Sequence, residues 1–426
     1  RFGKNNRYGT FPAFSLGWRI SRETFVRENL PFISDLKLRY GWGRAGNQEI
    51  SNTAVYGIYR AIYGGDRFGN DGGTAYDISG AGTGQLPSGF VAQQAANENL
   101  KWESSTQSNI GIDFGFLDNR LTGSADYFVK KATDILVLPP PIAVLGEGGS
   151  YYQNGASMNN KGFELLLTYA NNNNTGLSYT ISGNISTYRN QVVYLPSSVL
   201  TAYPGNGTDK TILGRSLGSY FGYIADGIFK TQKEVDDHAA QTGKGTGRIR
   251  FKDLNNDGTI NDLDRDFIGK PDPSFIYGIN FTMKWQDFDF ACFFQGVSGG
   301  KVNHAYKIYS DFSSLWVGTN WGARTLDAWS PTNTSSEIPA LTLLDANQEA
   351  RFSTYFLEPA TYLKLRTLQV GYALNNISKT VKARVFLEGT NLVTIKSKKF
   401  SGVDPESLNS GYPIPSVYTL GLNISF

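Results

Sequence analysis

A twelve-residue segment in the middle of the chain carries oxygen-bearing residues at the spacing used by calcium loops. Residues 253–264 read DLNNDGTINDLD. Such loops take ligands from positions 1, 3, 5, 7, 9 and 12 and place a glycine at position 6, where the chain turns sharply. The ligand positions are occupied here by Asp253, Asn255, Asp257, Thr259, Asn261 and Asp264. With Gly258 at position 6, the segment predicts a structural Ca²⁺ site in which Thr259 binds through its carbonyl.

The last ligand of this loop bears on its affinity. Asp264 stands where a glutamate is usual, and its shorter side chain reaches less far for bidentate binding. Weak calcium sites are typical of loops outside the cell. We expect the bound ion to fix the long connection predicted over residues 190–274. The alternative is an Asn/Asp-rich turn whose side chains hydrogen-bond their own backbone.

Other metal or catalytic chemistry has little support in the sequence. Cys292 is the only cysteine, so an intrachain disulfide is excluded, and His238 and His304 are the only histidines. A zinc cluster or a Ser-His-Asp triad is therefore not expected. The Gly146–Gly149 segment lacks the context of a phosphate loop, and the net charge of +3 comes without a basic block. We predict neither an enzyme nor a nucleic-acid-binding protein.

The elements that must carry the calcium loop are β-strands. In residues 416–426, Tyr418, Leu420 and Leu422 alternate with small or polar residues up to the terminal Phe426. The same alternation recurs in ten further segments: 14–20, 36–42, 110–116, 121–130, 163–169, 179–185, 275–285, 288–294, 363–372 and 383–391. Strands of about ten residues with one apolar and one polar face cross a bilayer in tilted antiparallel barrels. The pattern predicts an all-β fold, a transmembrane antiparallel β-barrel, with a β-bulge near Arg366 and Thr367.

The lengths of the connections alternate as well. Short connections at 117–120, 171–176, 286–287 and 375–381 alternate with long ones at 47–105, 131–160, 190–274, 297–361 and 394–415. Outer-membrane barrels have short periplasmic turns and long extracellular loops, so the C-terminus is expected in the periplasm. Single-chain bacterial barrels have an even number of strands, and about eleven are counted here. We therefore expect this chain to be the C-terminal part of a longer protein that closes the sheet.

The composition agrees with a barrel. Mean hydropathy is only −0.31, and no apolar run approaches the roughly eighteen residues of a spanning helix. Aromatic residues make up 14% of the chain, which suits the interfacial girdles of a barrel. The lumen-facing charges Arg19, Arg39, Asp113 and Glu164 are expected to pair across the barrel wall rather than to bind a solute.

Several motifs along the whole chain resemble one family. They are FGKNNRYG (Phe2–Gly9), FPAFSLGWRI (Phe11–Ile20), IGKPDP (Ile268–Pro273), YLKLR (Tyr362–Arg366), GTNL (Gly389–Leu392), DPE (Asp404–Glu406) and the final Tyr418–Phe426. With the calcium-type loop, they resemble SusC/RagA-type TonB-dependent outer-membrane transporters of Bacteroidota. The resemblance implies a 22-stranded barrel, of which about half is present here. It also implies an N-terminal plug, a TonB box and a signal peptide, all expected outside this chain.

The resemblance further implies partners and cargo. Members of that family work with a SusD-like surface lipoprotein, draw energy through TonB, and import oligosaccharides or peptides, with a dimer of transporter–lipoprotein pairs as the expected assembly. Outer-membrane lipid would surround the barrel. The rival functions are a passive porin, a secreted glycan-binding β-sandwich or propeller, and an outer-membrane enzyme.

Aromatic residues of the long loops are the candidates for substrate or partner contact. They are Tyr56, Tyr59, Tyr63, Tyr151, Tyr152, Trp316 and Trp321. Aromatic faces stack on sugar rings and pack on peptide side chains. We favour the alternative, in which these residues pack within the loops or contact the lipoprotein.

Overall fold

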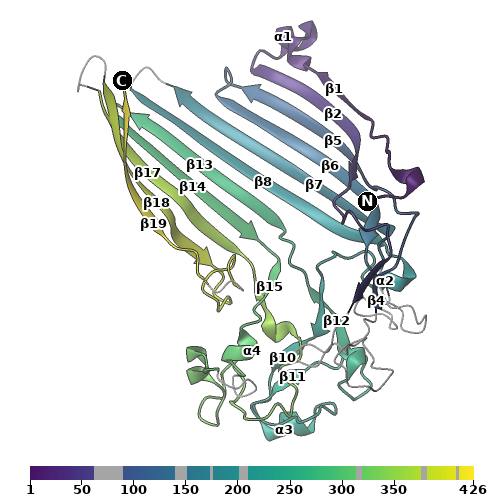
Figure 1. The fold of residues 1–426 in the computed structure, drawn as a ribbon. Helices are drawn as coiled ribbons and strands as arrows, with labels where there is room; N and C mark the ends of the chain where they lie inside the picture. The colour runs from purple at the N-terminus through teal and green to yellow at the C-terminus, as the bar shows by residue number, and fades with distance from the viewer. Residues whose placement is uncertain are drawn as a thin grey trace, which may run out of the picture.

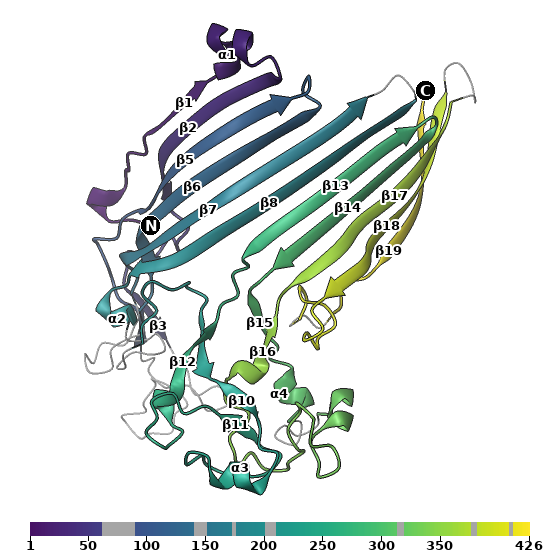
Figure 2. The same ribbon diagram turned by 180° about the vertical axis from the view of Figure 1, so that it is seen from behind.

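Eleven strands form one antiparallel sheet in the computed structural model, which describes residues 1–61, 90–139, 151–172, 176–200, 210–312, 319–375, 381–408 and 412–426. Each strand pairs with the strands before and after it in this set, and β1 and β19 are the two edges. Figures 1 and 2 show the strands side by side in a curved sheet. The strands are β1 (Ala13–Trp18), β2 (Ile33–Asn47), β5 (Glu103–Phe116), β6 (Leu121–Val137), β7 (Gln153–Asn172), β8 (Leu177–Tyr194), β13 (Phe275–Trp285), β14 (Phe288–Ser298), β17 (Tyr362–Leu374), β18 (Lys382–Lys396) and β19 (Val417–Ser425). All eleven predicted strands are confirmed.

The register places the apolar residues of every strand on one face. Leu38 of β2 lies opposite Trp18 of β1 on one side and Ile112 of β5 on the other. Because side chains alternate along a strand, Arg39 and Asp113 project from the opposite face. One apolar and one polar face explain the low mean hydropathy. No helix in the described part of the chain is long and apolar enough to cross a membrane.

The predicted bulge is confirmed. The register between β17 and β18 shifts between Leu365 and Thr367, and the pairing of β14 with β17 shifts between Phe293 and Phe294. Arg366 is the extra residue relative to β14, whereas two residues of β18, Asn391 and Leu392, lie opposite it. Its Nε donates to Gln295 Oε1 at 2.8 Å.

The strands β6, β7 and β8 are longer than predicted at the end nearest the long loops. β7 begins at Gln153, ten residues before the predicted start at Phe163. The added segment is mostly polar on both faces, so it lacks the alternation that marks a half-apolar strand, while its backbone hydrogen bonding to β6 and β8 continues.

The long connections gather at one end of the sheet. Figure 1 shows the long loops at the bottom, opposite the short turns, the helix α1 (Thr24–Asn29) and the C-terminus at the top. The described parts of 195–274 and 299–361 fold together into a unit that we call the loop lobe. A core of Tyr223, Ile249, Phe251, Ile260, Phe312 and Phe356 holds it together.

The loop lobe contains short elements that the sequence pattern did not reveal. They are α2 (Ser197–Leu200), β9 (Tyr220–Tyr223), β10 (Ala225–Ile228), α3 (Gln232–Asp236), β11 (Ile249–Phe251), the 3-10 helix η4 (Asp262–Asp264), β12 (Arg265–Gly269), β15 (Lys301–Asn303), α4 (Lys307–Ser310), η6 (Ala323–Asp327), η7 (Thr354–Phe356) and β16 (Leu357–Pro359). Outside the lobe lie η1 (Lys4–Asn6), η2 (Ile20–Arg22), β3 (Ile58–Ala61) and β4 (Phe90–Gln94). The strands of the lobe have three to five residues, too few for a period of two to stand out.

Candidate functional site

The polar face of the sheet carries ion pairs across neighbouring strands. Arg39 of β2 donates through Nη2 to Asp113 Oδ1 of β5 at 2.8 Å and to Asp126 Oδ2 of β6 at 2.9 Å. Arg19 Nε lies 3.3 Å from Asp35 Oδ1. These contacts confirm the expected pairing of Arg19, Arg39 and Asp113.

Glu164 is the exception among the predicted lumen charges. It lies on the same polar face, and no ion pair involves it within the described residues. Its neighbours across β6 and β8 are Asp126 and Ser186, neither of which carries a positive charge. The expectation of a pair is therefore not met for Glu164.

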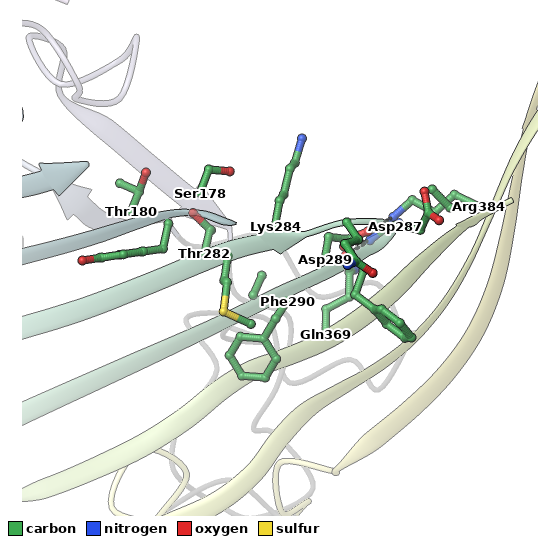
Figure 3. A pocket seen from close by; sticks show the side chains of 15 residues that line it. Ser178, Thr180, Thr282, Lys284, Asp287, Asp289, Phe290, Gln369 and Arg384 are labelled. Atoms are coloured by element: carbon green, nitrogen blue, oxygen red, sulfur yellow. Dashed lines mark hydrogen bonds and ion pairs between the residues drawn. The ribbon is translucent and has the colours of Figure 1, made fainter. Parts of the chain in front are cut away.

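A second charged group lines a cavity of about 770 Å³ near the short turns. Arg384 of β18 donates through Nε to Asp289 Oδ1 of β14 at 2.8 Å and through Nη2 to Gln369 Oε1 at 2.7 Å. Figure 3 shows these side chains with Ser178, Thr180, Thr282 and Lys284, which come from the neighbouring strands β8 and β13. Hydroxyl, amide and charged groups on a concave surface bind polar solutes or a protein surface, and no nucleophile–base pair is among them.

A buried ion cluster fixes the last long connection to the sheet. Lys364 of β17 donates to both Asp404 oxygens at 2.7 Å and to Glu406 Oε2 at 2.6 Å. Arg366 and Tyr362 also donate to Glu406. Burial alone would raise the pKa of Glu406, but hydrogen bonds from Lys364, Tyr362 and Arg366 outweigh it and lower that pKa. Two motifs that are far apart in the sequence, YLKLR and DPE, thus meet in one cluster.

A second buried carboxylate ties the same connection to the loop lobe. Glu358 of β16 accepts hydrogen bonds from Lys307 Nζ at 2.7 Å, Ser401 Oγ at 2.6 Å and the Ser401 backbone N–H at 2.9 Å. His304 Nδ1 lies 3.3 Å away. Burial opposes ionisation of Glu358, yet the hydrogen bonds from His304, Lys307 and Ser401 hold its pKa well below the ordinary value.

The calcium-type loop closes with the predicted shape. Gly258 has a φ of +79°, which suits a glycine at the sharp turn. Ile260 is buried in the core of the loop lobe, and the backbone beside it bonds to Ala240, through Ala240 N–H to Gly258 O at 2.8 Å and Ile260 N–H to Ala240 O at 2.9 Å.

The carboxylates of this loop bond backbone N–H groups. Asp253 accepts from Asn256 and Gly258, and Asp264 accepts from Leu254 and Asn261, at 2.7 to 2.9 Å. These are the local bonds of an Asn/Asp-rich turn. The described residues contain no group of three His, Cys, Asp or Glu side chains arranged to hold a metal ion. Each carboxylate oxygen keeps a second lone pair, so the Ca²⁺ site stays a prediction.

The five candidate contact aromatics in the described part of the chain lie in different environments. Tyr56 and Tyr59 are 62% and 70% exposed, whereas Tyr152 packs on the cluster of Phe2, Ala54 and Leu100, which fits the packing role we favoured. Tyr151 and Trp321 are partly exposed, and Trp321 precedes Gly322, whose N–H bonds Ser310 O beside α4. Tyr63 and Trp316 lie outside the described residues.

Eleven long antiparallel strands with an apolar outer face and a polar, charged inner face define the wall of a transmembrane β-barrel. More specifically, the chain belongs to the family "TonB dependent receptor-like, beta-barrel", whose model matches residues 1–392. The family is one of outer-membrane proteins, and the SusC/RagA resemblance is confirmed.

Individual relatives match the full length of this chain. TonB-dependent receptor P3 of Formosa agariphila is 30% identical over 100% of this chain and 42% of its own length. TonB-dependent receptor SusC of Bacteroides thetaiotaomicron is 31% identical over 100% of this chain and 41% of its own length. The solved structure of the RagAB peptide transporter shares the fold, with a TM-score of 0.79 and 23% identity over 100% of this chain and 44% of that one. The chain spans less than half the length of these relatives.

Proposed function

We propose that the protein to which this chain contributes imports oligomeric nutrients, glycans or peptides, across the outer membrane. The observation that carries the proposal is the wide sheet with a polar and charged inner face, in a chain similar to SusC and to a RagAB peptide transporter chain. A sheet of eleven strands that has not closed belongs to a barrel wide enough for an oligomeric solute.

The two sheet edges support the proposal that other strands complete the barrel. β1 and β19 each pair on one side only. An unpaired strand edge cannot face hydrocarbon, because its backbone N–H and C=O groups would have no partner. Barrels of about 22 strands are plugged, and a plugged barrel needs energy to open, which TonB coupling would supply.

In the proposed orientation the long loops are extracellular and the C-terminus is periplasmic. The asymmetry of short turns and long loops supports this orientation. The loop lobe and residues 397–408 and 412–416, joined through Glu358 and Ser401, then form the outer mouth of the barrel. A SusD-like surface lipoprotein would cap this mouth, in a dimer of transporter–lipoprotein pairs.

We also propose that the 253–264 loop binds Ca²⁺ as a structural ion. The residues that would hold it are Asp253, Asn255, Asp257, Thr259, Asn261 and Asp264. The turn at Gly258 and the inward Ile260 support this assignment. A bound Ca²⁺ would offset two of the three negative charges of Asp253, Asp257 and Asp264 and stabilise the lobe.

Uptake by cells that carry the full-length protein tests the proposed transport. Labelled oligosaccharides and labelled peptides are offered to cells with and without TonB. The proposal predicts accumulation of one cargo class that is lost without TonB. Equal accumulation in both strains would establish a passive pore instead.

A further inference from the structure

Three basic side chains lie together on the outer, apolar face of the sheet at the end nearest the long loops. Lys161 of β7 is directly opposite Arg189 of β8 and directly opposite Val129 of β6. Lys131 lies two residues after Val129 in β6, so the two side chains are on the same face. Since side chains alternate, these three cations share their face with the lipid-facing Tyr127 and the rest of the apolar band.

These cations, which we call the outer basic cluster, form no ion pair with a carboxylate in the described part of the chain. Lys131, Lys161 and Arg189 are exposed. The cross-strand row through Lys161 is Trp42, Ser108, Val129, Lys161 and Arg189, and the next row towards the loops is Arg44, Thr106, Lys131, Asn159 and Gln191. Neither of these described rows holds an acidic residue.

The arrangement differs from that on the inner face. There Arg39 is held between two aspartates, whereas here Lys161 and Arg189 are directly opposite each other. Like charges in that position are destabilising, so an anion between them is favoured. Arg189 also lines a cavity of about 350 Å³ together with Arg215 and Lys270, which adds positive charge at the same edge. Asp272, which accepts a hydrogen bond from Ser216 of that lining, offsets part of this charge.

The position of the cluster along the strands matches a membrane surface. Eight residues of β7 separate Lys161 from Tyr169 at the end nearest the short turns. That is roughly 26 Å of strand, or about 20 Å of depth after a tilt of about 40°. Trp42, in the row of Lys161, is of the type that marks the interface. The cluster therefore lies where the apolar band ends.

We propose that the outer basic cluster binds the phosphate groups of a phosphorylated glycolipid in the outer leaflet. The proposal rests on the orientation given under the proposed function, in which the long loops are extracellular. Lysine and arginine recognise phosphate through charge-assisted hydrogen bonds. The acyl chains of such a lipid would pack on the apolar band. Its phosphates would contact Lys131, Lys161 and Arg189, where that band ends.

The test uses the full-length protein in detergent and lipid A as the probe. Native mass spectrometry counts lipid A molecules bound to wild type, to the Lys131→Gln/Lys161→Gln/Arg189→Gln variant, and to a control that removes the same charge at the exposed Lys230, Lys398 and Lys399. Each cation near an anionic surface contributes roughly fivefold in affinity. We expect binding to fall at least about tenfold in the cluster variant and to be unchanged in the control. Lipid A stripped of its phosphates should bind wild type no better than it binds the cluster variant.

Other outcomes overturn the proposal. Equal binding of lipid A by wild type and the cluster variant would do so, as would an equal loss of binding in the control. Displacement of lipid A by millimolar inorganic phosphate would indicate a site for the free ion. Labelling of Lys230→Cys, in a Cys292→Ala background, with an impermeant maleimide on intact cells tests the orientation separately. If Lys230→Cys is not labelled on intact cells, the long loops are not extracellular, even if lipid A binds the protein in detergent.

Discussion

Lys364 Nζ and Asp404 Oδ2 form an ion pair at 2.7 Å across forty residues of sequence, and the Lys364 side chain is only 1% exposed. The pair joins the inner side of the sheet to the connection between β18 and β19. Glu406 is the second partner of Lys364 and also accepts from Arg366, so two cations face two carboxylates. The attraction between these charges offsets the desolvation penalty of burying them, because an unpaired buried charge costs several kcal/mol.

Removal of Lys364 should destabilise the protein. Lys364→Met leaves Asp404 without its cation, and loss of one partner of a buried pair costs about 3–5 kcal/mol. Thermal unfolding of the full-length protein in detergent would measure the change, and proteolysis would report release of residues 397–416. Lys399→Met, an exposed lysine of the same connection, is the control. A melting curve for Lys364→Met that matches the control would show that the ion cluster does not hold the connection.

Glu358 should make the attachment of the loop lobe sensitive to acid. Its folded pKa is below the ordinary value, so the stability it contributes is complete above that ordinary value of about 4.3 and is lost as the pH falls below it. The protection factors of the His304, Lys307 and Ser401 amides, which correct for the slower intrinsic exchange in acid, should therefore fall as the pH drops from about 5 towards the folded pKa of Glu358.

The matched variants for this prediction are Glu358→Gln and Glu337→Gln. The first should show low protection factors at neutral pH with little further change in acid, and the second, an exposed glutamate of the same lobe, should behave as wild type. Protection in the Glu358→Gln protein that still falls steeply in acid would assign the pH dependence to another group.

A side chain at Gly111 should disturb the ion pairs of Arg39. A Cβ at this position would clash with Asp126 Oδ1 and lie 2.7 Å from Arg39 Cζ, so the ends of these two side chains would have to move. Gly111→Ala is expected to displace the Arg39–Asp126 pair and to lower stability by about 1–3 kcal/mol. Gly41→Ala is the control on the same face, because a Cβ there meets nothing within 4 Å. Equal melting temperatures for the two variants would contradict the described packing around Arg39.

Calcium should stabilise the loop lobe. Removal of Ca²⁺ with EGTA is expected to lower the melting temperature and to expose the lobe to proteases, and Asp253→Asn/Asp264→Asn should abolish the difference. Asp237→Asn, which removes an exposed charge of the same lobe, should leave the calcium effect intact. A wild-type protein that melts identically with Ca²⁺ and with EGTA would favour the self-bonded turn.

The strands were predictable because the bilayer imposes the pattern on them. Tyr418, Leu420 and Leu422 must face lipid while their neighbours face the lumen, so the period of two is strict. Gln153–Asn160 escaped prediction because that part of β7 lies beyond the apolar band, where neither face must be apolar. The strands of the loop lobe were not predicted because they are too short to show a period of two.

Within the candidate site, contacts between neighbouring strands were easier to anticipate than contacts made by loops. Arg39 and Asp113 follow from strand alternation and pairing, whereas Asp404 reaches Lys364 from a connection whose path no periodicity encodes. The calcium-type loop was found by its spacing. The structure bears out the turn at Gly258 and buries Ile260 in the core of the loop lobe.

We propose that this chain forms part of the wall of a larger, energy-coupled importer. The most direct measurement is mass spectrometry of the native protein extracted from membranes in mild detergent, with every copurifying chain identified. The account predicts peptides from a longer polypeptide that supplies further strands and a plug, together with a SusD-like lipoprotein. Recovery of a lone 46.8 kDa chain in the soluble fraction would contradict it.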